Sequence, residues 1–219
     1  MADLAQTIKF HASGQIDRAV EGYKVILNSA TPHPVAANNL GVILQKQGDF
    51  AESMRLYDQA IQLQPDYAEA YFNRANANRD FDRFQAEQDY QTALSINSQY
   101  VKAFWNFGVY LVEQGRFRDG VIQLQSASRL APQNAEITEN LLNACCKADD
   151  TNLLSEIMAG LDRDSLASKF SLGLVAASCF DFLEQTDEAT FLLEQLTPET
   201  PNQKSMLSLG WSSVDVSNA

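Results

Sequence analysis

Residues 39–65 read NLGVILQKQGDFAESMRLYDQAIQLQP, and this stretch decides the fold. Apolar residues recur at helical spacing on both sides of Gly48, which predicts two short helices joined by a turn. Gly41 is small enough for a close approach of two helices, and Tyr57 is large enough to fill the space beside it. Pro65 lies where the second helix has to end. The stretch therefore predicts one helix–turn–helix unit.

The same order of residues returns further along the chain. Asn39, Asn73, Asn106 and Asn140 are separated by 34, 33 and 34 residues. Small, aromatic or apolar, and alanine positions return between them at matching offsets, for example at Gly108, Leu124 and Ala127. A fixed period of this length is the signature of one supersecondary unit stacked many times. If the register is right, Gly41→Leu overpacks a helix contact at a cost of about 1–3 kcal/mol.

The pattern resembles the tetratricopeptide repeat, a helix–turn–helix unit of about 34 residues. The resemblance implies an all-α, right-handed superhelical solenoid of about six antiparallel helix pairs. Residues 68–100 lack one residue near Gln85, so we expect a shortened turn or second helix there. The expected divisions are repeats at 1–33 (degenerate), 34–67, 68–100 and 101–134, degenerate hairpins at 135–169 and 170–203, and a polar tail at 204–219.

The composition limits the possible partners. The formal net charge is −12, from 16 basic and 28 acidic residues, so the surface repels phosphate backbones and anionic lipid. We therefore expect neither nucleic acid nor membrane as a partner, and a soluble, acidic protein with a neutral or basic partner. The first ten residues lack the basic head and apolar run of a signal peptide, and no apolar stretch is long enough for a membrane span.

The three cysteines, Cys145, Cys146 and Cys179, show no paired spacing. We interpret Cys145 and Cys179 as small core residues of a protein in a reducing, cytoplasmic compartment. Neither histidine lies in a setting typical of a metal site, and no phosphate-binding loop is present. The sequence predicts no catalytic residue, no metal, no cofactor and no enzymatic activity.

The resemblance implies that the first helix of each repeat lines a concave, peptide-binding groove. Stacked helices lie about 9–10 Å apart and an extended peptide rises about 3.3 Å per residue, so one Asn per repeat would meet every third guest residue. Two alternatives stay open: the Asn side chains satisfy neighbouring backbone or water, and Trp105 packs in the core. The candidate groove residues are Asn38, Asn39, Phe72, Asn73, Asn76, Lys102, Trp105, Asn106, Asn140 and Asn143.

We interpret the chain as a non-catalytic scaffold that binds an extended segment of a protein partner in this groove. One alternative is a regulatory, targeting or oligomerising arm of a separately encoded enzyme, such as a glycosyltransferase or methyltransferase. Another is a homodimer formed through the terminal repeats, where Phe180, Phe182 and Phe191 suggest an apolar end face.

Overall fold

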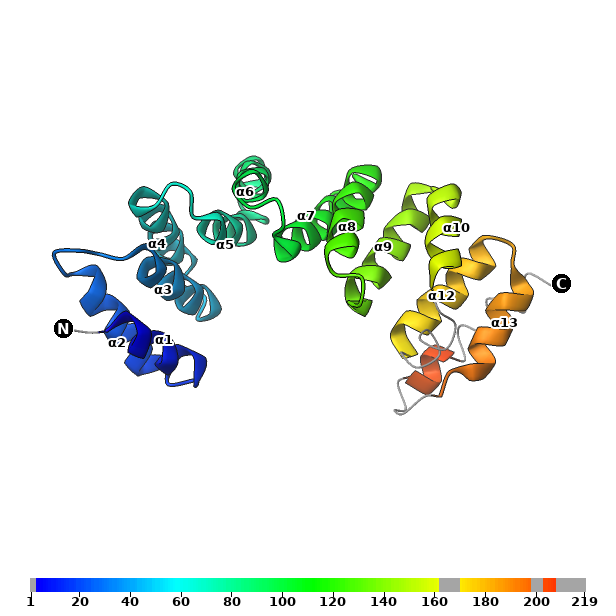
Figure 1. Cartoon of the computed structure of the whole chain (residues 1–219), viewed down its shortest axis with the longest axis horizontal. Coiled ribbons are helices and arrows are strands. Elements are labelled where there is room, and N and C mark those ends of the chain that lie inside the picture. Colours follow the sequence, from blue (N-terminus) through cyan, green and yellow to red (C-terminus); the bar gives the residue numbers. More distant parts are fainter. Residues whose placement is uncertain (1–2, 162–169, 198–202, 208–219) are drawn as a thin grey trace. The chain divides into compact units, whose positions relative to one another are not determined.

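The computed structural model describes residues 3–161, 170–197 and 203–207, and in these ranges every regular element is an α-helix. The helices follow one another in pairs (Figure 1), which confirms the predicted all-α solenoid of helical hairpins. Their bounds are α1 Leu4–Ala12, α2 Ile16–Leu27, α3 Pro34–Lys46, α4 Phe50–Leu63, α5 Ala68–Asn78, α6 Arg83–Ile96, α7 Val101–Glu113, α8 Phe117–Leu130, α9 Ala135–Ala148, α10 Thr151–Gly160, α12 Phe170–Phe182 and α13 Thr186–Gln195.

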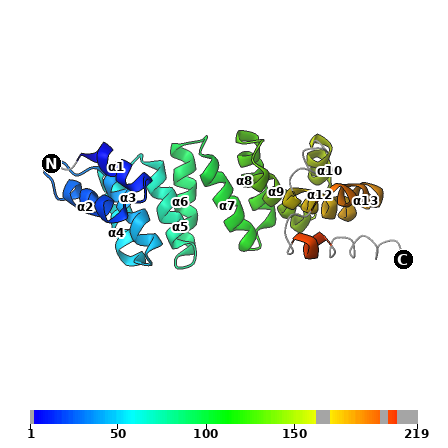
Figure 2. The ribbon, with the colours of Figure 1, turned by 90° about the horizontal axis from the view of Figure 1, so that it is seen from below.

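The chain divides into two compact units, Met1–Ala103 and Phe104–Ala219. In the first unit, α1 pairs with α2, α3 with α4, and α5 with α6, each with its neighbour in the chain (Figure 2). The apolar faces of α1 to α5 meet in one cluster that includes the fully buried Ala19, Tyr23 and Ala60. This cluster positions the first helices α1, α3 and α5, which carry most of the candidate site.

The turns of the first unit follow from local chemistry. Gly48 has a φ of +87°, a left-handed conformation that favours glycine, and it ends α3. Asp49 then caps α4, because its carboxylate accepts the Glu52 backbone N–H at 3.2 Å. Inside the hairpin, a Cβ built on Gly41 would lie 2.8 Å from Cε1 of Tyr57, so this position requires glycine.

The third hairpin corrects one expectation. The second helix, α6, has 14 residues, as many as α4 and α8, and is not shortened. Instead, the first helix α5 has 11 residues where α3 and α7 have 13. The linker from α5 to α6 runs from Arg79 to Asp82 and carries no glycine, so the chain ends the first helix early and turns over more residues.

In the second unit, α8 packs on α9, and α9 contacts both α10 and α12. A largely aliphatic cluster joins them, with Leu141, Leu142 and Leu154 fully buried. α9 and α12 end without glycine, and the left-handed positions are taken by Asp149 (φ 55°) and Glu184 (φ 59°). Parts of the expected hairpins 135–169 and 170–203 and of the polar tail lie outside the described residues. No helix in the described ranges has the length and apolar character needed to cross a bilayer.

Candidate functional site

Three of the predicted groove residues form one hydrogen-bonded group in the first unit. Asn73 on α5 donates to Asn38 on α3 at 2.8 Å, and Asn38 donates to its neighbour Asn39 at 3.3 Å. Asn38 is 0 % exposed, so its side chain lies in the interior, whereas Asn39 and Asn73 are half-buried. A buried amide without partners is costly, and here both of its ends are bonded. Asn38 therefore holds the other two in place.

The group continues to the first hairpin. Asn39 donates to the hydroxyl of Tyr23 on α2 at 3.1 Å, and this hydroxyl lies 3.3 Å from Nδ1 of His11 on α1. A neutral imidazole can accept the tyrosine proton at Nδ1, which gives every link a donor and an acceptor. We call these five side chains the polar row: Asn73, Asn38, Asn39, Tyr23 and His11. It connects three successive hairpins through α5, α3, α2 and α1.

Two other tyrosines hold amide side chains in the same way. The Tyr57 hydroxyl donates to Gln45 on α3 at 2.7 Å, and the Tyr90 hydroxyl donates to Asn76 on α5 at 2.6 Å. Both tyrosine side chains are fully buried, and burial raises the pKa of Tyr57 well above its ordinary value. The hydroxyl groups of these buried tyrosines therefore orient the two amide side chains from the interior of each hairpin.

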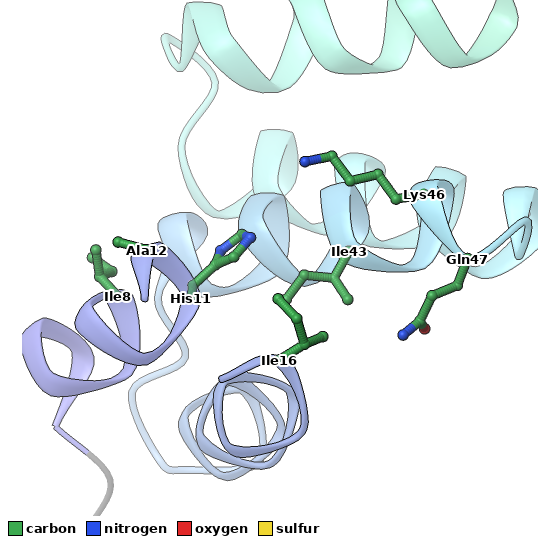
Figure 3. A pocket seen from close by; sticks show the side chains of 7 residues that line it. All are labelled: Ile8, His11, Ala12, Ile16, Ile43, Lys46 and Gln47. Atoms are coloured by element: carbon green, nitrogen blue, oxygen red, sulfur yellow. The ribbon is translucent and has the colours of Figure 1, made fainter. Parts of the chain in front are cut away.

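A largely apolar pocket of about 480 Å³ lies at one end of the polar row, between α1, the start of α2 and the end of α3. Figure 3 shows its lining side chains, with Ile16 and Ile43 converging on the floor. Ile43 and Lys46 follow Asn39 by four and seven residues on α3, so the pocket and the Asn group share one face of that helix. The lining residues are Ile8, His11, Ala12, Ile16, Ile43, Lys46 and Gln47.

The rim of the pocket carries one positive charge, that of Lys46, although the chain as a whole is acidic. Burial, and then the nearby Lys46 ammonium, lower the pKa of His11 below its ordinary value of 6.5. His11 is therefore neutral near pH 7, which suits its contact with Tyr23. Lys46 is exposed and has no carboxylate partner among the residues that the structure describes. The rim thus offers one cation above an aliphatic floor.

Phe72 does not offer a surface anchor. It is 8 % exposed, and its ring packs 6.4 Å from the ring of Tyr90 and 5.1 Å from that of Tyr100. Phe72 lies 34 residues after Asn38, at the same position of its hairpin, and like Asn38 it is directed into the interior. Lys102 lies at the start of α7, where it is exposed.

The remaining predicted residues lie in the second unit, on α7 and α9. Trp105 is half-buried against the aliphatic cluster, and its Nε1 is buried without a hydrogen-bond partner among the described residues. This supports the core alternative for Trp105. Asn140 donates to the Glu136 carbonyl of its own helix at 2.8 Å, and Asn143 is exposed. Asn106 on α7 is half-buried.

Sequence reasoning missed the pocket, and it missed an ion pair beside the Asn group. Arg74 on α5 forms two bonds to the buried carboxylate of Asp89 on α6, at 2.8 and 2.7 Å, and a third to Asp58 at 2.6 Å. This cluster fixes α5, and with it Asn73, against α4 and α6. The signal for the pocket was present, since Ile43 and Lys46 follow Asn39 at helical spacing.

Only two of the three phenylalanines predicted for the dimer surface are exposed. Phe180 is 8 % exposed and belongs to the core cluster of the second unit, so it is not a surface residue. Phe182 and Phe191 remain exposed, at 43 % and 46 %. The homodimer through the terminal repeats stays a prediction.

The fold defines the class of the protein. Its helices form pairs with small residues where they cross, and amide side chains lie on the first helices, so it is a helical repeat protein. Residues 37–79 match the family model described as TPR repeat. These residues therefore carry a tetratricopeptide repeat, and the fold of the chain is similar to that of tetratricopeptide repeat proteins. Its fold and relatives support a role as a protein–protein interaction scaffold.

Among the relatives, human Tetratricopeptide repeat protein 6 is 30% identical over 90 residues, 39% of this chain and 17% of that protein. The Peroxisomal targeting signal receptor of Kluyveromyces lactis is 24% identical over 187 residues, 77% of this chain and 32% of the receptor. The chain thus spans at most about a third of the curated relatives that it matches.

Two solved structures share the fold. YrrB, a TPR protein with an unusual peptide-binding site, superposes with a TM-score of 0.70 at 14% identity, over 92% of this chain and 100% of YrrB. A tetratricopeptide repeat protein from Parabacteroides merdae superposes with a TM-score of 0.65 at 15% identity, over 97% of this chain and 91% of the other.

Proposed function

We propose that this chain is a non-catalytic scaffold that binds an extended protein segment along α1, α3 and α5 of its first unit. The observation that carries the proposal is the polar row, which holds Asn39 and Asn73 in fixed orientations beside an apolar pocket. A carboxamide can bond both the N–H and the C=O of one peptide unit, so it grips backbone of any sequence. Fixing the amide in advance lowers the entropic cost of binding.

Asn73 has the capacity that this role requires. It uses one amide N–H on Asn38, which leaves its second N–H and its Oδ1 without a bond to the residues that the structure describes. Asn39 uses its oxygen on Asn38 and one N–H on Tyr23, which leaves one donor. The two side chains together can donate to and accept from a guest backbone.

The pocket provides an apolar anchor for the guest, a role that the buried Phe72 does not fill. Its floor of Ile8, Ile16 and Ile43 suits one aliphatic side chain of the guest, and Lys46 at the rim suits a guest carbonyl or carboxylate. Away from this rim the chain is acidic, so the rest of the guest is neutral or basic.

The relatives support a protein partner. The peroxisomal receptors among them are, by name, receptors for a targeting signal, and they match this chain over 77% and 66% of its length. We propose the cytoplasm as the location, because the three thiols are free in the structure. We also propose that the repeats divide at the positions expected from the sequence, with each described helix pair falling inside one repeat.

The test is a selection of random linear peptides, displayed on phage, against the full chain, followed by fluorescence anisotropy with the enriched peptides. Asn73→Ala should weaken binding roughly 2- to 10-fold, which corresponds to about 0.5–1.5 kcal/mol for one hydrogen bond. Ala12→Phe should weaken it at least as much, because Ala12 is exposed and a larger side chain there fills the pocket.

Asn152→Ala on α10 is the matched control, because Asn152 is an exposed asparagine of the second unit. Melting temperatures of all variants separate lost binding from lost folding. Peptides that bind the wild type and both site variants equally well would place binding elsewhere and reject the proposed site. A selection that enriches no peptide would reject the function itself.

A further inference from the structure

Two cysteines that are far apart in the sequence meet in the second unit. Cys146 on α9 and Cys179 on α12 are 33 residues apart in the chain, and their Sγ atoms lie 3.6 Å apart. Cys179 is 1 % exposed, whereas Cys146 is half-buried. The two sulfurs are in van der Waals contact, about 1.5 Å further apart than in a disulfide. Only one of the pair can be reached from solvent.

The two thiols differ in their ionisation. The hydrogen bond between the two sulfurs lowers the pKa of Cys146. The same bond, together with burial, raises the pKa of Cys179. The thiolate is the nucleophilic form of cysteine, so the accessible member of the pair is also the more reactive one. The neighbouring Cys145 differs from both, because burial followed by the charge of Asp150 raises its pKa to about 12.

We propose that Cys146 and Cys179 form a redox modification site, in which a hydroperoxide oxidises Cys146 and Cys179 resolves the product into a disulfide between α9 and α12. The geometry carries this assignment: an accessible sulfur lies against a buried partner, and each belongs to a different helix of one packed pair. Closing the bond needs only a small side-chain movement, because the sulfurs already touch.

The chemistry takes place in two steps. The Cys146 thiolate attacks one peroxide oxygen, the O–O bond breaks, and the leaving hydroxide or alkoxide takes a proton from water, so Cys146 becomes a sulfenic acid. The Cys179 sulfur then attacks Cys146 Sγ, an S–S bond forms, and the S–O bond breaks with release of water that carries the Cys179 proton. Two thiols lose two electrons, and the peroxide is reduced by the same two.

Cys145 is the internal control for this proposal. It precedes Cys146 in α9 but is 0 % exposed, and no contact of its sulfur with Cys179 is found among the described hydrogen bonds. A helix turns by about 100° per residue, so Cys145 and Cys146 point in different directions. Cys145 therefore stays a thiol while the other two react.

The experiment uses the full chain, first reduced and then treated with hydrogen peroxide alone. Thiols titrated in denaturant should fall from three to one, on a chain that remains monomeric on a non-reducing gel. Peptide mapping without reduction should join the peptides that contain Cys146 and Cys179. The oxidised chain should melt at a higher temperature, because the link constrains the unfolded state, and dithiothreitol should reverse each change.

Three serine variants identify the sulfur that the peroxide oxidises and the sulfur that then closes the disulfide. Cys145→Ser should still lose two thiols and form the disulfide between Cys146 and Cys179. Cys146→Ser should form no disulfide within the chain. Cys179→Ser should leave Cys146 as a sulfenic acid that dimedone captures. Three surviving thiols in the wild type, a link that persists in Cys146→Ser, or links only between separate chains would each overturn the proposal. If Cys179→Ser does not fold, the wild type and Cys145→Ser still give the answer.

Discussion

The two units are built from the same hairpin but hold their interiors together differently. Among the described residues, the first unit buries five polar or charged residues, Thr7, Asn38, Ser53, Asn78 and Asp89, and the side chains of four of them, Thr7, Asn38, Ser53 and Asp89, are hydrogen-bonded. The described part of the second unit buries one, Thr138, and packs Leu141, Leu142 and Leu154 around its thiols. One interior is specified by directional bonds and the other by shape and volume.

This difference bears on the repeat pattern, which is clear over residues 34–103 of the first unit and becomes faint after residue 134 of the second. A buried amide or ion needs a partner at one distance and angle, so the residues that supply it are restricted. An aliphatic contact accepts many combinations of similar volume. Residues 34–103 therefore keep recognisable positions, whereas the hairpins after residue 134 satisfy the same geometry with residues that no pattern identifies.

The largest effect should come from the buried ion pair. Asp89→Ala leaves the Arg74 guanidinium, 16 % exposed, without its main partner, and should cost about 3–5 kcal/mol of unfolding free energy. The matched control in the second unit is Asp119→Ala, whose pair with Arg116 is 48 % and 46 % exposed and is worth under about 1 kcal/mol. Urea unfolding measures both variants. Equal losses would show that directional bonds do not distinguish the units.

The next effect concerns the close helix contact. Gly41→Ala places a Cβ 2.8 Å from the Tyr57 ring and should cost about 1–3 kcal/mol. The same substitution at Gly160, where a Cβ meets nothing within 4 Å, should stabilise the chain by up to about 1 kcal/mol. Thermal unfolding of the two variants should therefore shift in opposite directions. Two shifts of the same sign would contradict the packing described for Gly41.

The turns provide a smaller contrast. Gly48→Ala should cost about 1–2 kcal/mol, because alanine is strained at a φ of +87° although the site has open space. Asp149→Gly should have the opposite sign and a smaller size, since glycine removes the left-handed strain at the end of α9. Chemical denaturation of both variants tests the pair, and a stabilised Gly48→Ala would refute the argument.

The smallest effect is a dependence on pH in the first unit. The pKa of His11 is lowered in the folded state, so the neutral ring contributes stability above pH 6.5, and this is lost as the pH falls through the folded pKa. The melting temperature of the wild type should fall more than that of His11→Asn between about pH 7.5 and pH 5. Parallel pH profiles would show that His11 takes no part in this dependence.

The sequence predicted the hairpins well, because Gly41, Tyr57 and Gly48 each have one physical role that the structure confirms: close contact, filling and turning. The sequence predicted which face of a helix a residue lies on, but not how deeply that residue is buried. Asn38 and Asn39 are neighbours in the sequence, yet only the packed structure reveals that one is buried and holds the other. Phe72, 34 residues after Asn38 and at the same position of its hairpin, is buried in the same way.

The contact between Cys146 and Cys179 was not predictable. It depends on how α9 packs on α12. The core of this region is aliphatic, and its sequence shows no clear repeat pattern. A one-residue change in the register of either helix would separate the sulfurs, and nothing in the sequence defines that register.

The polar row also has a consequence for folding. Stacked repeats generally open one at a time from their ends, because each contacts only its neighbours. Loss of the first hairpin would break the link from Asn39 to Tyr23 and loosen the bonds of the buried Asn38, which would weaken its hold on Asn73. The cost of opening α1 and α2 is thereby shared by α3 and α5. Amide protons in these four helices should exchange with deuterium as one cooperative block, without the graded fraying of an ordinary repeat array.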